Sequence, residues 1–283
     1  MKKLLPEKFP RGLDEIPGPP KFLYIVGKLP PEGYKYLIVV GSRRLTSYGI
    51  DATRALIRGL AGYPVVIVSG LAQGIDTIAL TAGLDAGLRT IAFPGSGLDP
   101  EVIVPSSNRL LAERIVSQGG CLLSEYDPTF PAAEWTFPQR NRLMAGMAHA
   151  VLIVEAAMKS GTMITARLAL DYNRDVLAVP GSIFSPVSVG THYLIKNGAT
   201  PITSSSDLLT ALGFAPGSTS ARTAELDNCS PLEKKILEVL ANPAPRDEII
   251  RTAGLPAPEV NTTLSIMELK GLIKEEYGEI RRT

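Results

Sequence analysis

The chain has 283 residues, of which 45% are hydrophobic and 20% are charged, enough for one large domain, one small domain and a proper buried core. This composition excludes disorder for most of the chain. Its 29 Lys and Arg nearly cancel its 28 Asp and Glu, so a bound polyanion would have to be held by a local cluster of cations.

Residues 1–34 are rich in proline and predict an extended lead-in with one short strand, FLYIVG, that packs on a larger body. From Tyr36, apolar runs alternate with helical segments. The expected strands are YLIVVG, VVIVSG, RTIAFPG, GCLLSE, AVLIVEA, DVLAVPG and a short ATPIT; the expected helices lie around 50–60, 76–86, 108–116, 162–171 and 190–197, with a last one ending at Leu212. Continuous apolar strands between helices are typical of a parallel sheet covered on both faces, so residues 35–212 predict a doubly wound α/β domain.

The stretch FPQRNRLMAG places two arginines close to a predicted helix start. Pro138 suits a first helical position, and Leu143, Met144 and Met147 follow as a buried face, which puts Arg140 and Arg142 in the opening turn. Cations are unfavourable there by roughly 0.3 to 1 kcal/mol each, because a helix N-terminus carries a partial positive charge. This pattern indicates that an anion binds nearby.

Residues 213–228 are small and polar with Gly and Pro, which predicts an exposed linker. Residues 229–283 read as three helices followed by a hairpin around Gly278, the pattern of a winged helix. Cys121 and Cys229 form no C-x-x-C motif, and no segment approaches ~18 uninterrupted apolar residues. We therefore expect a cytoplasmic protein with no disulfide framework, no zinc site and no membrane span.

The loops that follow parallel strands meet at one edge of the sheet, so their residues should lie around one crevice. Several of these loops contain Ser-Gly or Gly-Ser, which lets backbone N–H groups approach an anion. The same loops and the FPQRNR helix start bring up to five cations to this edge: Arg43, Arg44, Arg140, Arg142 and Lys159. The alternative for each arginine is pairing with Asp76, Glu125 or Glu155. Phe137 and Tyr48 could stack on bases, although ordinary packing is the better interpretation for both.

Familiar catalytic and cofactor motifs are missing from the sequence. It has no G-x-x-x-x-G-K-[ST] phosphate loop, GSGLDP lacks the third glycine of a dinucleotide fingerprint, and neither G-x-S-x-G nor H-E-x-x-H occurs. We therefore expect no cofactor, no metal and no enzymatic activity. Catalysis by a carboxylate pair drawn from Asp76, Asp99, Glu125 and Glu155 stays open, since no spacing selects a pair.

Eight blocks in order resemble the DNA-processing protein A family, also called DprA or Smf. They are VVGSRRLTSYG, VSGLAQGIDTIAL, GSGLD, LLSEY, FPQRNRLMAG, VLIVEAAMKSGTMITARLAL, AVPGSI and LIKNGA, and they cover about residues 36–212. The resemblance implies an extended Rossmann-like domain that binds single-stranded DNA in a basic pocket, usually as a dimer. It also implies loading of the RecA recombinase during natural transformation, without an established catalytic activity.

The resemblance also implies which residues bind DNA. Together with the cations and Phe137 above, the expected set is Gly41, Ser42, Arg43, Arg44, Ser69, Gly70, Gly74, Phe137, Arg140, Asn141, Arg142, Lys159, Ser160, Gly161 and Thr162. Four positions depart from the family pattern. Gln73 replaces a usual basic residue, Leu80 a frequent His, Val104-Pro105 a frequent Tyr-Pro, and His192 a common Asn. One side of the pocket should therefore be less cationic and less polar.

The presumed recognition helix of the winged helix carries Glu259, Glu268 and only one cation, Lys270. Only Arg281 and Arg282, at the end of the expected wing, would help it, whereas a duplex reader needs Arg, Lys, Asn or Gln along that face and basic flanks. We hypothesise that this domain docks a protein or assists DNA binding weakly. The isolated domain should then not bind duplex DNA with a sub-micromolar Kd in physiological salt.

Two other functions have less support in the sequence. Phosphoribohydrolase-like enzymes use the same type of sheet with a PGGxGTxxE motif; MKSGTMIT keeps Gly161 and Thr162 but has Thr165 where the catalytic glutamate would lie. A regulator that senses a small phosphate ligand is disfavoured by the acidic recognition helix. A non-enzymatic binder of single-stranded DNA is therefore the leading hypothesis, with the enzyme as its alternative.

Overall fold

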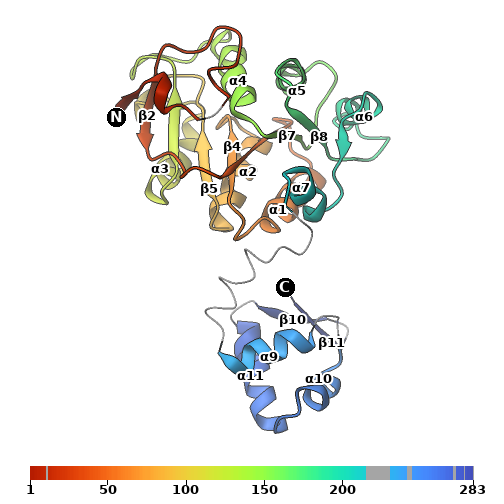
Figure 1. Cartoon of the computed structure of the whole chain (residues 1–283). Coiled ribbons are helices and arrows are strands. Elements are labelled where there is room, and N and C mark those ends of the chain that lie inside the picture. Colours follow the sequence, from red (N-terminus) through yellow and green to blue (C-terminus); the bar gives the residue numbers. More distant parts are fainter. Residues whose placement is uncertain (11, 215–229, 241–243, 270–271, 277, 283) are drawn as a thin grey trace. The chain divides into compact units, whose positions relative to one another are not determined.

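The computed structural model describes residues 1–10, 12–214, 230–240, 244–269, 272–276 and 278–282 (Figure 1). The chain divides into two compact units, Met1–Ser218 and Thr219–Thr283, which are described separately. The predicted linker lies outside the described residues from residue 215 onward, as do Cys229 and Lys270. Cys121 is buried, and burial raises the pKa of its thiol to about 12.

Within the described residues, nine strands of the first unit form one sheet in the order β1-β2-β6-β5-β4-β3-β7-β8-β9. The strands are β1 (Lys2–Leu4), β2 (Leu23–Gly27), β3 (Lys35–Val40), β4 (Val65–Ser69), β5 (Arg89–Ala92), β6 (Cys121–Ser124), β7 (Ala150–Ile153), β8 (Asp175–Ala178) and β9 (Thr200–Pro201). At one edge, β2 pairs antiparallel with both β1 and β6, with Leu4 opposite Leu23 and Ile25 opposite Leu123. The other pairs of this sheet are parallel. The predicted mostly parallel α/β fold is confirmed.

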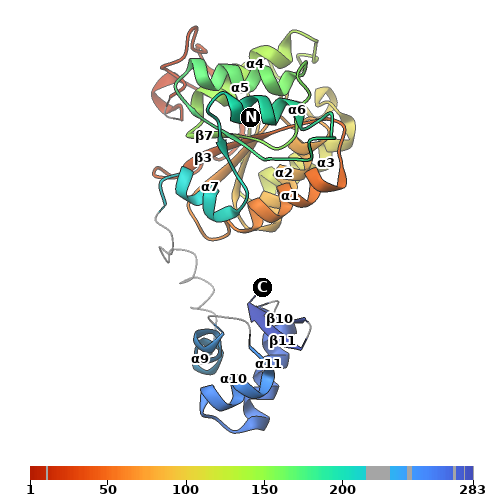
Figure 2. The same cartoon turned by 90° about the vertical axis from the view of Figure 1, so that its right-hand side faces the viewer.

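Helices cover both faces of this sheet (Figures 1 and 2). One layer holds α1 (Ser47–Arg58), α2 (Ile75–Asp85), α3 (Arg109–Ser117) and α7 (Ser205–Ala211); the other holds α4 (Thr136–Met147), α5 (Gly161–Asp171) and α6 (Val189–Lys196). Both faces need a helix layer because successive side chains of a strand point to opposite faces. In β3, Leu37 and Val39 pack with the first layer, and Ile38 and Val40 pack with the second. A strand that is buried on both faces has no polar side, which is the continuous apolar pattern seen in the sequence.

The chain reverses direction in the sheet beside β3. Strands β3, β4, β5 and β6 follow one another outward, with β5 between β4 and β6, and the chain then returns through α4 to place β7 on the other side of β3. The loops after β3 and β7 therefore lead to opposite faces of the sheet. Ligands of open α/β sheets bind at this kind of switch point, outside the carboxyl ends of the strands.

Helix α4 begins earlier than its sequence predicts. It starts at Thr136, with Trp135 already in a helical conformation, and the Thr136 hydroxyl donates to the Gly95 carbonyl at 2.5 Å. Pro138 is accommodated in the first turn because the N–H groups there have no partner within the helix. Arg140 and Arg142 consequently lie beyond the first turn, and the prediction that both occupy it was wrong.

In the described part of the C-terminal unit, three helices precede a hairpin. They are α9 (Pro231–Val239), α10 (Arg246–Ala253) and α11 (Ala257–Leu269), followed by β10 (Ile273–Glu276) and β11 (Glu279–Arg282). Ile236, Ile249, Val260 and Met267 are among the residues of its own core. The predicted winged helix is confirmed. Among the described residues, no helix has the length and apolar character needed to span a bilayer.

Candidate functional site

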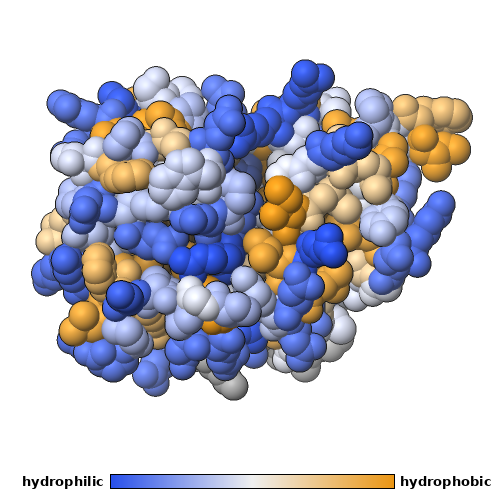
Figure 3. Space-filling view, turned by 90° about the horizontal axis from the view of Figure 1, so that it is seen from above, coloured by the Kyte–Doolittle hydropathy of each residue, from blue (hydrophilic) through white to orange (hydrophobic). Residues whose placement is uncertain are grey.

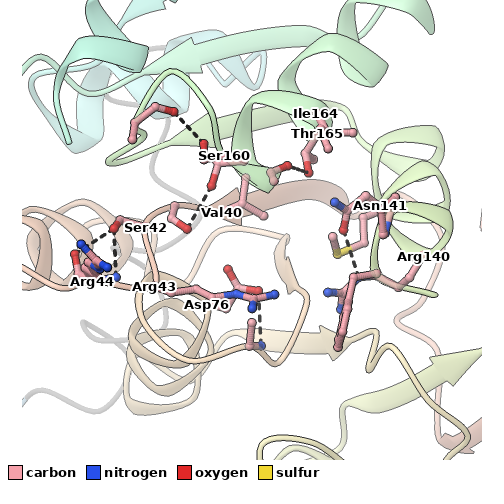
Figure 4. Close-up of a pocket in the computed structure, with 18 of the residues that line it drawn as sticks. Val40, Ser42, Arg43, Arg44, Asp76, Arg140, Asn141, Ser160, Ile164 and Thr165 are labelled. Carbon is pink, nitrogen blue, oxygen red and sulfur yellow. Dashed lines mark hydrogen bonds between the residues drawn. The ribbon is translucent and has the colours of Figure 1, made fainter. Parts of the chain in front are cut away.

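A cavity of about 500 Å³ lies at the switch point of the sheet (Figure 4). In the figure, Ser42, Arg43 and Arg44 line one side, Arg140 and Asn141 of α4 line another, and Ser160 and Thr165 lie across from Asp76. Ten of the predicted site residues meet here: Gly41, Ser42, Arg43, Arg44, Phe137, Arg140, Asn141, Ser160, Gly161 and Thr162. The loops that follow the parallel strands therefore meet around one crevice, as their positions in the sequence predict.

The loop after β3 supplies the exposed cations of the cavity. Ser42 Oγ accepts from the Arg44 N–H at 3.0 Å and donates to the Arg44 carbonyl at 2.8 Å, which fixes a tight turn around Arg43. Both arginines are exposed, and the ion pairs found among the described residues do not include either one. The Arg43 guanidinium lies 5.5 Å from the centre of the Phe137 ring, within cation–π range. Arg43 is thus held in place without being neutralised.

Arg140 lines the cavity, but most of its side chain is buried and bonded within the protein. Its side chain is only 5% exposed, and its guanidinium donates to the carbonyls of Gly70 and Phe93, with Nε donating to Asn141 Oδ1 at 3.1 Å. Burial lowers the pKa of Arg140 to about 10, although the nearby Asp76 carboxylate acts to raise it. Gly70 and Phe93 follow β4 and β5. Arg140 therefore ties two strand exits to α4 and has few donors left for a phosphate.

Arg142 lies outside the cavity. Its guanidinium pairs with the Glu125 carboxylate and donates to the Gly18 carbonyl at 2.9 Å. Burial raises the pKa of Glu125, and the nearby Arg142 opposes this shift. Of the two alternatives that the sequence left open for Arg142, the structure shows pairing with a carboxylate. The assignment of Arg142 to the binding cavity is corrected accordingly.

The start of α5 forms the opposite wall of the cavity. Ser160 precedes the helix, but its Oγ donates to the Ala157 carbonyl at 2.8 Å and does not cap the first N–H groups. Thr162 Oγ1 donates to the Gly41 carbonyl at 3.0 Å and joins this wall to the loop after β3. Lys159 is exposed and lines a neighbouring groove instead. The α5 wall therefore presents helix-start N–H groups to the cavity, beside Arg43 and Arg44.

Asp76 lines the floor of the cavity, a role that the sequence analysis did not assign. Its Oδ2 accepts from the N–H groups of Gly70 and Ala72 at 3.0 and 3.4 Å, which holds the loop after β4. Burial raises the pKa of Asp76, and Arg140 and these N–H groups oppose the shift. Its position in SGLAQGID, two residues after Gly74 at the start of α2, was the available signal, since Asp side chains often accept from the backbone N–H groups of such loops.

A second, smaller cavity of about 220 Å³ lies on the other side of Arg43 and Phe137. Gly70, Gln73, Val104 and Pro105 contribute to it, so two of the positions that depart from the family pattern meet there. Ser69 is buried and donates to the Val39 carbonyl at 2.7 Å, so it supports the loop from below. Tyr48 donates to the Pro180 carbonyl and does not line either cavity, in keeping with ordinary packing.

Gly74 should tolerate no side chain, because two loops touch at this residue. Its φ is +91°, and a Cβ atom would lie 2.2 Å from the Ser42 carbonyl oxygen and 2.6 Å from the Arg43 Cα. We expect Gly74→Ala to lower the free energy of unfolding by about 2 to 5 kcal/mol, through backbone strain and overpacking. Gly87→Ala is the matched control, since Gly87 also has a positive φ but has open space around its Cβ position. Equal losses in urea unfolding of the two variants would show that the loop contact is unimportant.

Comparisons with known proteins agree on one family. The family model for DNA recombination-mediator protein A matches residues 3–213, and the model for the DprA winged helix domain matches residues 218–279. Protein Smf of Escherichia coli is 38% identical over 92% of this chain and 71% of its own length. The DNA processing protein DprA of Streptococcus pneumoniae is 41% identical over 75% of this chain and 73% of its own length.

Solved structures give the same result. The X-ray structure of DprA from S. pneumoniae matches with a TM-score of 0.69 and 39% identity, over 74% of this chain and 73% of that one. DNA processing protein A from Helicobacter pylori, whose structure was used to describe its single-stranded DNA binding mode, matches with a TM-score of 0.65 and 32% identity over 75% of this chain and 96% of that one.

Proposed function

The chain belongs to the DNA recombination-mediator protein A family, and we propose from this that it binds single-stranded DNA in the cavity at the switch point of its sheet. The observation that supports the site most strongly is Arg43, an exposed cation 5.5 Å from the Phe137 ring. A phosphate can pair with its guanidinium while a base stacks on the aromatic ring.

The proposed contacts divide between phosphates and bases. Arg43, Arg44 and the N–H groups at the start of α5 bind phosphate oxygens, and Phe137 offers a flat apolar surface to a base. Asp76 and Arg140 hold the loop and the strand ends from beneath. These contacts carry no sequence information, so binding should be insensitive to base sequence. We propose that the chain acts in the cytoplasm as a DNA-binding protein and catalyses no reaction.

Photochemical crosslinking tests the location of the site. Oligo-dT carrying a photoreactive thymine analogue is bound to the full chain, irradiated, and mapped by mass spectrometry of the digested protein. We expect crosslinks in the peptides that contain Arg43, Phe137 and Gly161. Crosslinks confined to the C-terminal unit would contradict the proposed site.

We further propose that the bound strand is delivered to the RecA recombinase during natural transformation. The family and its DNA-processing relatives support a role with incoming DNA. The test is the rate at which RecA hydrolyses ATP on single-stranded DNA that is coated with a single-strand-binding protein. Addition of the chain should shorten the lag, and an unchanged lag would contradict the loading role.

A homodimer is also proposed, and an exposed apolar groove supports it. Met158, Ile164, Leu170 and Tyr193 line one groove along α5 and α6 and are each more than two fifths exposed. Figure 3 views the first unit from above and shows hydrophobic side chains gathered on the right, the side on which Figure 1 places α5 and α6. Exposed apolar side chains that gather in one groove are a feature of protein interfaces.

We expect Leu170→Glu to convert the dimer to a monomer, because it places a charge in the apolar groove. The measurement is the mass from light scattering after size exclusion. Leu110→Glu is the control, since Leu110 is 76% exposed on α3. A monomeric parent chain, or a variant that remains dimeric, would contradict this assignment.

A further inference from the structure

An aromatic cluster lies at the start of α4, next to residues that line the cavity, and none of the functions above uses it. Tyr126, Phe130 and Trp135 lie between β6 and the start of α4. The rings of Tyr126 and Phe130 are stacked at 5.0 Å, and Trp135 meets both edge to face at 5.8 and 5.9 Å. None of the three belongs to the hydrophobic core clusters of the described residues.

Trp135 is fixed in position although it is 53% exposed. Two perpendicular rings hold the indole, and Tyr126 is itself held, since its hydroxyl donates to Gln139 Oε1 at 3.0 Å. The Phe130 carbonyl accepts from the Gly97 N–H at 2.8 Å, which anchors the loop to the exit of β5. An exposed ring that is already ordered loses little rotamer entropy when a ligand stacks on it.

The position of Trp135 connects it with the cavity. Its neighbour Glu134 and Pro138, one helical turn further along α4, both line the cavity. Residues i and i+3 share a helix face, so Trp135 and Pro138 lie on the same side of α4. A strand that leaves the cavity over Glu134 and Pro138 would therefore reach the indole next.

The surroundings of Trp135 favour a nucleobase over a protein surface as the group that stacks on it. Glu134, directly before Trp135, is exposed, and Gln139 Oε1 accepts from the Tyr126 hydroxyl, so polar groups flank the three rings. A protein interface needs a larger apolar centre than these three rings provide. Single-strand binding proteins combine a cationic groove with aromatic rings on which bases stack.

We propose that Trp135, buttressed by Tyr126 and Phe130, is a stacking platform for a base of the strand that leaves the cavity. This inference rests on the proposed binding of single-stranded DNA, and it extends the site along α4. Stacking is insensitive to sequence and nearly independent of salt, whereas the contacts of Arg43 are electrostatic. The two parts of the site can therefore be separated by experiment.

Trp135 is the only tryptophan of the sequence, so the fluorescence of the full chain reports on the platform directly. Labelled oligo-dT is titrated with the chain while the anisotropy of the label and the indole emission are both recorded. We expect the emission to be quenched in step with the anisotropy change. Trp135→Ala should weaken binding roughly 5- to 150-fold at every salt concentration, without changing the salt dependence.

Two further variants keep the result interpretable. Trp135→Phe preserves a stacking surface and should lose less affinity than the alanine variant, and thermal unfolding checks that both variants fold. Leu5→Ala, which removes an exposed apolar side chain of the lead-in, should bind as the parent does. Binding by anisotropy with unchanged indole emission and no loss in Trp135→Ala would overturn the platform and leave the cavity intact. If no oligo-dT binds at all, the proposed function fails and the platform with it.

Discussion

Replacement of Arg140 by alanine is expected to lower the free energy of unfolding by about 3 to 5 kcal/mol, the usual cost of breaking a buried charged contact. The guanidinium is the donor for the Gly70 and Phe93 carbonyls and the cation nearest to the buried Asp76. Its loss leaves the two carbonyls without this donor, and leaves the Asp76 carboxylate with backbone N–H partners but no neighbouring cation. The measurement is urea unfolding of the full chain followed by the emission of Trp135, which lies in the same unit.

Two further variants serve as comparisons for Arg140→Ala. Arg140→Lys keeps the charge but replaces the planar guanidinium with a single ammonium group. We therefore expect a smaller but clear loss in the free energy of unfolding. Arg58→Ala removes an exposed arginine at the end of α1 and should change stability by less than about 0.5 kcal/mol. An Arg140→Ala variant as stable as the parent would show that the arginine does not tie the strand exits together.

Replacement of Arg43 by alanine is expected to weaken binding of single-stranded DNA about 10- to 100-fold with little effect on stability. The side chain is exposed, and a hydrogen bond to a charged group contributes about 1.5 to 3 kcal/mol. Loss of one phosphate contact should also reduce the slope of log K against log salt by about 0.7. Fluorescence anisotropy with oligo-dT over a salt series measures both effects.

Arg58→Ala is again the matched control, since it removes the same charge from an exposed position at the other end of α1. It should bind as the parent does. If both variants bind alike, the charge of the whole domain, and not the cavity, attracts the strand.

The fold follows from the sequence because the signals are local. Runs such as VVIVSG are buried on both faces of the sheet, and the glycines and serines that follow them mark the strand exits. β1 was not predicted, because it has three residues and only Leu4 is buried. The start of α4 was placed too late, since Thr136 is held by the distant Gly95 carbonyl, a contact that no local pattern reveals.

The site was only partly predictable for a similar reason. Sequence position brings Arg43, Arg140 and Arg142 to the same edge of the sheet, but burial decides what each one does. Arg43 stays exposed, Arg140 is enclosed by two strand exits, and Arg142 reaches Glu125 at the end of a neighbouring strand. These differences depend on where α4 lies over the sheet, which the spacing of residues does not encode.

The most direct test of the central claim is a titration of the full chain with oligo-dT, single-stranded against duplex, between about 50 and 200 mM salt. We predict binding to the single strand with a log–log slope of about −1.4 or steeper, as two cations release counterions, and clearly weaker binding to the duplex. Equal affinity for the two forms, or no binding to either, would contradict the account.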